Sequence, residues 1–193
     1  MSALSQHLTR RRSHRRSVIL SAYGISPRAN FVAHVPTLYL LCGKIAAGKS
    51  TLARCLAARP ATLLISEDHW TSNLFAGDLR TIDDYARYSA RLRAAMGPHI
   101  VDILQQGLSI VLDFPANTVS NRNWMGSLIT QSGAANELHL LDVPDTICKQ
   151  RLRERNVGGE HPFQVSEAEY DLFTSYFVPP GPSEGFNVVV HTP

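Results

Sequence analysis

Short apolar runs alternate along this chain with longer stretches in which apolar residues recur at helical spacing. The alternation starts at Thr37 and continues to the end of the sequence. Strands buried in a parallel sheet are apolar runs, and the helices between them carry one apolar face. We therefore predict an α/β fold, with strands at residues 37–42, 61–66, 109–113, 137–143 and 187–191.

Helix signals fill the gaps between these strands. The pair Gly97-Pro98 interrupts the amphipathic stretch 82–106, so two helices are expected there. Ser166 and Glu169 form a capping box that opens the last helix. The other helices are predicted at residues 50–58, 121–132, 145–155 and 166–177.

The segment 43–51 fits the phosphate-binding pattern G-x-x-x-x-G-K-[ST] at every fixed position. It directly follows the first predicted strand and precedes a helix. Small residues let the backbone curl so that its N–H groups point at phosphate oxygens, and the helix N-terminus adds positive charge. The predicted nucleotide-binding residues are Gly43, Lys44, Ile45, Ala46, Ala47, Gly48, Lys49, Ser50 and Thr51.

Lys49 and Ser50 have separate roles in such a loop. The lysine ammonium reaches the β- and γ-phosphates, and the serine hydroxyl binds Mg²⁺. A chance match has a probability of about one in a hundred, so a purely structural glycine turn is a poor explanation. ATP and Mg²⁺ are therefore the predicted cofactors, and no sequence cluster suggests a second metal.

Two features outside the loop distinguish this chain from P-loop GTPases and motor ATPases. The sequence contains no N-K-x-D segment, which disfavours a GTPase. Asp113 is the last residue of the third predicted strand and lies on the Mg²⁺ side, but no glutamate lies beside it to activate water for hydrolysis. A phosphotransferase is therefore favoured over a motor ATPase.

Four segments resemble, in order, those of a known family. They are 43–51; 65–70; 111–114, followed by Arg122 and Trp124; and 140–144, leading into Arg151 and Arg155. The chain resembles the "predicted kinase" branch (AAA-type ATP-binding) of small P-loop kinases, which are related to zeta toxins, polynucleotide 5′-hydroxyl kinases, chloramphenicol phosphotransferase and gluconate or shikimate kinases. The resemblance covers most of residues 37–180. It implies a three-layer P-loop NTPase fold, a five-stranded parallel sheet of order 2-3-1-4-5 and a small helical lid at about 151–165.

The resemblance also implies a catalytic acid just past the second strand, where Asp68 matches. A carboxylate there can align the acceptor hydroxyl and take its proton late in phosphoryl transfer. The neighbouring Glu67 is the alternative base. In a third interpretation, Ser66, Glu67 and Asp68 only cap the next helix.

Arg151 and Arg155 lie four residues apart, so both side chains can project from one helix face. By resemblance they belong to a lid that closes over ATP and neutralises charge on the transferred group. We expect them to bind ATP and to act in catalysis together with Lys49 and Asp68. A solvated surface of the helix is the alternative.

The remaining candidates concern the acceptor and the metal. Asp113 is expected to bind Mg²⁺ or the acceptor, unless it only anchors the loop after its strand. Arg122 is an acceptor or phosphate ligand by analogy, or else an exposed surface residue. Trp70 either stacks on a cyclic acceptor or belongs to the core.

The positive charge of the chain is concentrated at its start. Residues 1–35 hold six arginines and no acid, which leaves 13 basic against 16 acidic residues in 36–193. We therefore predict a basic, flexible extension at 1–35 and a P-loop kinase domain at 36–193. The extension is a transit peptide, an arm that binds nucleic acid or a membrane surface, or a segment without function.

Cysteine usage and hydropathy suggest a cytoplasmic protein. Cys42, Cys55 and Cys148 are far apart, which argues against both disulfides and a zinc site. No apolar run approaches the length of a membrane helix. A monomer or homodimer is expected.

These observations favour a kinase that moves the γ-phosphoryl group of ATP onto a hydroxyl of a small molecule. The alternatives are a kinase directed at polynucleotides or nucleotides, with the basic arm contacting phosphates, and a zeta-toxin-like ATP-binding protein. The sequence does not name the acceptor, which is expected to lie against residues 66–106 and 114–124.

Overall fold

The computed structural model describes residues 34–79, 81–158 and 165–193. Within them, Val35 to Pro193 belong to one compact unit. All but the last two residues of the predicted extension 1–35 lie outside the described residues, as do residues 159–164 of the predicted lid.

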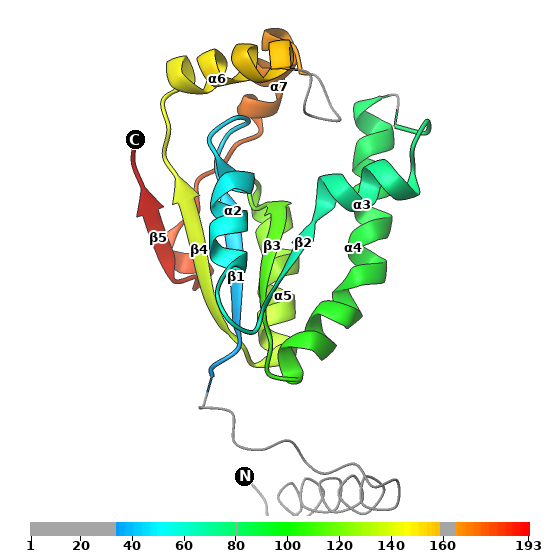
Figure 1. The fold of residues 1–193 in the computed structure, drawn as a ribbon, viewed down its shortest axis with the longest axis vertical. Coiled ribbons are helices and arrows are strands. Elements are labelled where there is room, and N and C mark those ends of the chain that lie inside the picture. Colours follow the sequence, from blue (N-terminus) through cyan, green and yellow to red (C-terminus); the bar gives the residue numbers. More distant parts are fainter. Residues whose placement is uncertain (1–33, 80, 159–164) are drawn as a thin grey trace, which may run out of the picture. The chain divides into compact units, whose positions relative to one another are not determined.

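The centre of this unit is a parallel sheet whose strands are ordered β2-β3-β1-β4-β5, so the predicted fold class and strand order are confirmed (Figure 1). The middle strands β1 and β3 are almost entirely buried, which explains why the sequence shows them as continuous apolar runs. The strands are β1 (Thr37–Cys42), β2 (Thr62–Ser66), β3 (Ser109–Pro115), β4 (Ala135–Leu141) and β5 (Val188–His191).

Helices cover both faces of the sheet and form the outer two of three layers. On one face, α4 (Ile82–Gln105) and α5 (Val119–Ser132) bury apolar side chains against β1 and β3. On the other face, α2 (Lys49–Ala57) packs on the same two strands. In the described residues, no helix is both long and apolar enough to cross a bilayer.

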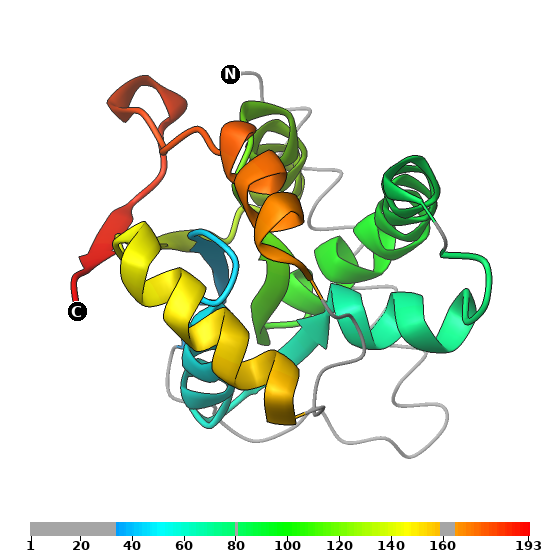
Figure 2. The same ribbon diagram turned by 90° about the horizontal axis from the view of Figure 1, so that it is seen from above.

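Two further helices lie above the carboxyl ends of the strands. Here α6 (Asp145–Gly158) and α7 (Glu167–Ser175) share a hydrophobic cluster with the P-loop residue Ala47 and the end of β4. Figure 2, which looks onto this end, shows α6 running across the P-loop and the start of α2. The capping box of Ser166 and Glu169 is confirmed as the start of α7.

The predicted break at Gly97-Pro98 is wrong, because α4 continues through both residues. Proline removes one backbone hydrogen bond in a helix interior. Pro98 is exposed, so water can reach the carbonyl that loses its partner. Leu92 and Ile100 are buried on either side of it, and their packing keeps the helix continuous.

Candidate active site

The P-loop, residues 43–48, joins β1 to α2 and has two positions that require glycine. Gly48 has a φ of 107°, which L side chains rarely adopt. A Cβ atom on Gly43 would lie 3.1 Å from both the Cβ and the carbonyl oxygen of Leu141, so β4 leaves no room for a side chain. The Gly43 N–H also donates to Asn117 Oδ1 at 2.9 Å. These contacts fix the path of the backbone into the loop.

Lys49 folds back over the loop. Its Nζ donates to the carbonyl oxygens of Gly43 at 2.7 Å and Lys44 at 2.8 Å. Burial lowers the pKa of Lys49, and the negative charge of Asp113 opposes this shift. The Lys49 Nζ therefore lies inside the loop, with a carboxylate nearby that favours its charged form.

Ser50 and Asp113 form the second polar pair of the site. The Ser50 hydroxyl is close enough to the Asp113 carboxylate to stabilise its charged form. Burial raises the pKa of Asp113, while Ser50 and Lys49 stabilise its charged form. Asp113 lies opposite Ser66 in the register of β3 and β2, so it is at the carboxyl edge of the sheet. The pair supplies two oxygens of the kind that Mg²⁺ prefers.

Asp68 lies in the first turn of α3 (Glu67–Leu74). Its negative charge raises the pKa values of Lys49, Asp113 and Arg155, alongside the larger effects of burial. Such effects require proximity, so Asp68 is near both the P-loop and α6. The capping role belongs to Ser66, whose Oγ accepts from the His69 N–H at 3.5 Å.

Glu67 has a different environment from its neighbour. It is only 2% exposed, and the Tyr85 hydroxyl of α4 donates to its Oε2 at 3.1 Å. Burial raises the pKa of Glu67, and Arg93 and the hydroxyls of Tyr85 and Ser89 oppose that shift. Glu67 therefore ties α3 to α4, whereas Asp68 lies beside the P-loop.

Arg151 and Arg155 extend from α6 toward two parts of the same site. Arg151 Nη1 donates to the carbonyl oxygen of Ala47 at 3.3 Å. The Nε and Nη2 atoms of Arg155 are buried and have no hydrogen-bond partner among the described residues. Burial lowers the pKa of Arg155, and Asp68 acts in the opposite sense. Unpaired buried donors of this kind are unusual and point to an anionic ligand.

A carboxylate that the sequence analysis missed connects α6 to the P-loop. Asp145, at the start of α6, forms an ion pair with Lys44 and accepts a hydrogen bond from the Tyr170 hydroxyl at 3.0 Å. Lys44 is the main cause of the lowered pKa of Asp145. Tyr170 of α7 is fully buried. The P-loop, α6 and α7 therefore meet at one carboxylate.

A small cavity of about 160 Å³ lies beside the P-loop, on the side of β4 and β5. Its walls combine apolar side chains with one guanidinium and one imidazole. They are formed by Ala47, Leu141, Val143, Arg151, His191, Thr192 and Pro193. His191, the last residue of β5, was not among the predicted site residues.

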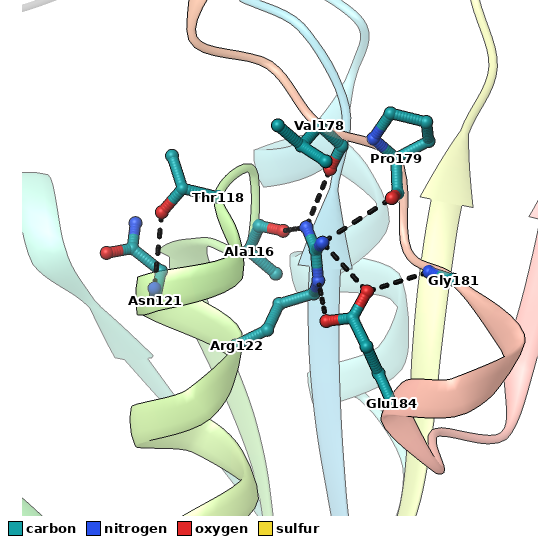
Figure 3. Close-up of polar contacts among 8 residues, drawn as sticks. All are labelled: Ala116, Thr118, Asn121, Arg122, Val178, Pro179, Gly181 and Glu184. Carbon is teal, nitrogen blue, oxygen red and sulfur yellow. Dashed lines mark hydrogen bonds and ion pairs between the residues drawn. The ribbon is translucent and has the colours of Figure 1, made fainter.

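Arg122 is not exposed, and the structure gives it a scaffold position instead of an acceptor position (Figure 3). Its guanidinium is fully buried and pairs with Glu184, with distances of 2.6 Å from Nε to Oε2 and 2.9 Å from Nη2 to Oε1. It also donates to the carbonyl oxygens of Ala116, Val178 and Pro179. These partners satisfy the side chain, so we do not retain Arg122 as a substrate ligand.

Trp70 is 39% exposed on α3 and lies outside the hydrophobic clusters of the core. Among the described residues, no group of three or more His, Cys, Asp or Glu side chains could hold a metal ion. Ser50 and Asp113 therefore remain the candidate metal ligands, and they need phosphate oxygens to complete a coordination sphere.

Comparisons with known proteins agree with this geometry. A family described as AAA domain matches residues 38–180. A proposed kinase from Chloroflexus aurantiacus has a TM-score of 0.66 at 21% identity, and the match covers 83% of this chain and 87% of that one. Kti12 from Chaetomium thermophilum, solved with ADP-AlF3, has a TM-score of 0.62 at 13% identity, with coverage of 80% and 88%.

The APS kinase of Mycobacterium tuberculosis, solved with AMPPNP and APS, has a TM-score of 0.56 at 16% identity, with coverage of 82% and 89%. At these identities the likeness is one of fold. No curated protein matches the sequence.

Proposed function

Because the chain belongs to the AAA domain family, we propose that it is an ATP-dependent phosphotransferase that moves the γ-phosphoryl group to a hydroxyl of a small molecule. One observation carries the proposal. Lys49, Asp68, Asp113 and Arg155 come from four different elements, and the charge of Asp68 is close enough to act on the pKa values of the other three. Such a group combines cations for phosphate with an acid for the acceptor.

The residues present fit a magnesium–nucleotide complex. The two unpaired nitrogens of Arg155 and the ammonium of Lys49 suit a triphosphate. Ser50 would bind Mg²⁺ directly, and Asp113 would hold it through water or contact the acceptor. When bound, Mg²⁺ would neutralise charge on the β- and γ-phosphate oxygens.

In the proposed reaction, Asp68 orients the acceptor hydroxyl and accepts its proton. The acceptor oxygen forms a bond to the γ-phosphorus while the bond from that phosphorus to the β–γ bridging oxygen breaks, and its electron pair leaves with ADP. Lys49 and Arg155 hold the phosphates and stabilise the charge that spreads over the transferred group, and Arg151 contacts the nucleotide beside the P-loop. Trp70 is retained as a candidate contact to the acceptor.

The names of proteins with the same fold support a small acceptor. A gluconokinase from Sinorhizobium meliloti and a sugar kinase from Janibacter are among them. The free thiols of Cys42, Cys55 and Cys148 suit a reducing compartment, which supports a cytoplasmic location.

Two variants test the mechanism. ATP labelled at the γ-position and Mg²⁺ would be incubated with a panel of sugars, sugar acids, nucleosides and 5′-hydroxyl oligonucleotides. We expect transfer to at least one small molecule, a loss of about 10²–10⁴-fold in Asp68→Asn, and unchanged ATP binding by calorimetry. Asp102→Asn, an exposed acid on α4, is the matched control and should keep full activity. No binding of ATP by the wild type, or full turnover by Asp68→Asn, would refute the mechanism.

The nucleic-acid alternative rests on the six arginines of residues 1–35. All six lie outside the described residues. The same panel tests it. Phosphorylation of the oligonucleotide, lost at higher salt and lost when arginines 10, 11, 12, 15 and 16 become glutamine, would favour it over a small acceptor. ATP binding without transfer to any acceptor would favour the zeta-toxin-like alternative.

A further inference from the structure

Three side chains form a polar row across β4 and β5 that ends at the cavity beside the P-loop. His139 is 4% exposed, and its Nδ1 lies 2.9 Å from His191 Nε2. On its other side, His139 Nε2 lies 3.3 Å from Glu137 Oε2. His191 is the last residue of β5 and is one of the residues that line the cavity. The row therefore runs from a carboxylate through two imidazoles to the cavity wall.

The carboxylate at one end sets where the protons lie. A carboxylate cannot donate, so it favours the proton of His139 on Nε2. Burial and the neighbouring His191 lower the pKa of His139, which is therefore neutral near pH 7. A neutral imidazole that carries its proton on Nε2 has a bare Nδ1, which can only accept. The hydrogen bond at 2.9 Å is then donated by His191 Nε2 to His139 Nδ1.

This assignment fixes the chemistry that His191 offers to the cavity. An imidazole with its single proton on Nε2 has a bare Nδ1, which is a hydrogen-bond acceptor, and this is the form in which His191 would accept from a ligand. Among the described residues, Nδ1 of His191 forms no hydrogen bond. This nitrogen can therefore accept a hydrogen bond from a ligand in the cavity.

The walls of the cavity suit a flat heterocycle. Ala47 belongs to the loop that would hold the phosphates, so the cavity is within reach of the rest of a nucleotide. Leu141, Val143 and Pro193 supply apolar surface, and the Arg151 guanidinium is a planar group that stacks on aromatic rings. Arg151, His191 and Thr192 are the polar residues of the lining, and an apolar pocket with a few polar groups is the usual arrangement for binding a ring with specificity.

We infer that His191 selects nucleotides whose base presents an exocyclic amino group to it, as adenine and cytosine can. His139 and Glu137 hold His191 in the tautomer whose Nδ1 accepts a hydrogen bond from this amino group. The inference rests on the proposed function, because the phosphates must bind in the P-loop. An amino group donates to the bare Nδ1, whereas the carbonyl oxygen at the same place in hypoxanthine or uracil meets another acceptor. A mismatch of this kind leaves both groups without partners.

Titration calorimetry of the full chain with Mg²⁺ tests the inference with matched ligands. ATP carries an amino group at position 6 of the purine, where ITP carries a carbonyl oxygen, and only ITP has a proton on the adjacent N1. Inorganic tripolyphosphate has no base, so its binding reports on the P-loop alone. We expect ITP to bind about ten- to a hundredfold more weakly than ATP. In His191→Phe, which keeps a ring but has no nitrogen, that ratio should fall to near one while tripolyphosphate binding stays unchanged.

Two further variants separate recognition by His191 from its positioning. His139→Phe leaves His191 in place but removes the acceptor for its Nε2–H, so the preference for ATP over ITP should also collapse. His191→Asn can place Oδ1 near the position of Nδ1 and should restore part of the preference. A structural role alone would lower the affinities for ATP, ITP and tripolyphosphate together.

The possible results distinguish the inference from the proposed function. If tripolyphosphate and all nucleotides fail to bind, both are wrong. If ATP and ITP bind equally to the wild type, or if His191→Phe keeps the wild-type ratio, the inference is wrong and the phosphotransferase proposal stands.

Discussion

The buried guanidinium of Arg122 holds the segment after α7 against α5, and replacing it with methionine measures its contribution to stability. Methionine keeps an apolar stem but carries no donor. Arg122→Met would leave the Glu184 carboxylate, whose side chain is 17% exposed, without its cation, and would leave the carbonyls of Ala116 and Val178 without donors. Removing one partner of a buried ion pair costs about 3–5 kcal/mol.

A loss of this size is large for a chain whose unfolding free energy is about 5–15 kcal/mol. At about 2–4 °C per kcal/mol, the Tm of Arg122→Met should fall by about 6–20 °C, as measured by circular dichroism during heating. Arg153→Met is the matched control. Its ion pair with Glu167 spans 2.9 Å, but the two side chains are 63% and 47% exposed, so at most about 1 kcal/mol should be lost.

The double variant Arg122→Met with Glu184→Gln separates the lost charge partner from the lost packing. It leaves no uncompensated carboxylate, so it should recover part of the stability lost by Arg122→Met alone. Equal losses in Arg122→Met and Arg153→Met would refute the assignment of Arg122 as a buried structural cation.

Three further results are expected. Arg122 is the main cause of the lowered pKa of Glu184 in the folded protein. The ion pair therefore stabilises the fold fully at pH values above 4.5, the ordinary pKa of glutamate, and this contribution is lost as the pH falls through the lower pKa of the folded state. Unfolding free energies from urea titrations at several pH values should therefore fall in acid more steeply for the wild type than for Arg122→Met, and parallel curves would contradict this. Gly43→Ala should weaken tripolyphosphate binding by at least about tenfold in calorimetry, because its Cβ would lie 3.1 Å from β4, whereas Gly126→Ala, with 3.9 Å of clearance, should bind normally. Arg155→Gln should lower kcat by about 10³-fold, with a smaller loss of ATP affinity, and a loss of kcat below about tenfold would remove Arg155 from the mechanism.

The features that the sequence predicted correctly depend on local patterns. The middle strands β1 and β3 were recognisable because residues buried on both faces must be apolar, and the other three strands because they are short apolar runs between helices. The P-loop was recognisable because glycine is required where the backbone turns or β4 approaches. The resemblance to small P-loop kinases is confirmed at the level of family and fold. Once the strands and their order are known, the carboxyl edge of the sheet brings Asp113 and the start of α3 together.

The errors and omissions arose where distant contacts outweigh a local signal. Gly97-Pro98 is a strong helix breaker, yet buried residues on both sides of it keep α4 continuous. Arg122 resembled a surface or ligand arginine because Glu184, its partner, lies 62 residues further along the chain. Asn117 and His191 each follow or end a strand beside the P-loop, a position that could have marked them as candidates. Their contacts could not be foreseen without the packing of the loop and of β5.

The contact between Lys44, Asp145 and Tyr170 explains how two arginines of α6 reach different parts of the site. Asp145 fixes the start of α6 to the P-loop and to α7. Arg151 and Arg155 follow six and ten residues later, which places them about 9 and 15 Å along the helix axis from that anchor. At the first position, Arg151 reaches the carbonyl oxygen of Ala47. At the second, Arg155 is close enough to Asp68 for that carboxylate to affect its pKa. One carboxylate that belongs to no phosphate-binding motif thus sets the position of both guanidinium groups, and a change at Asp145 should displace them together.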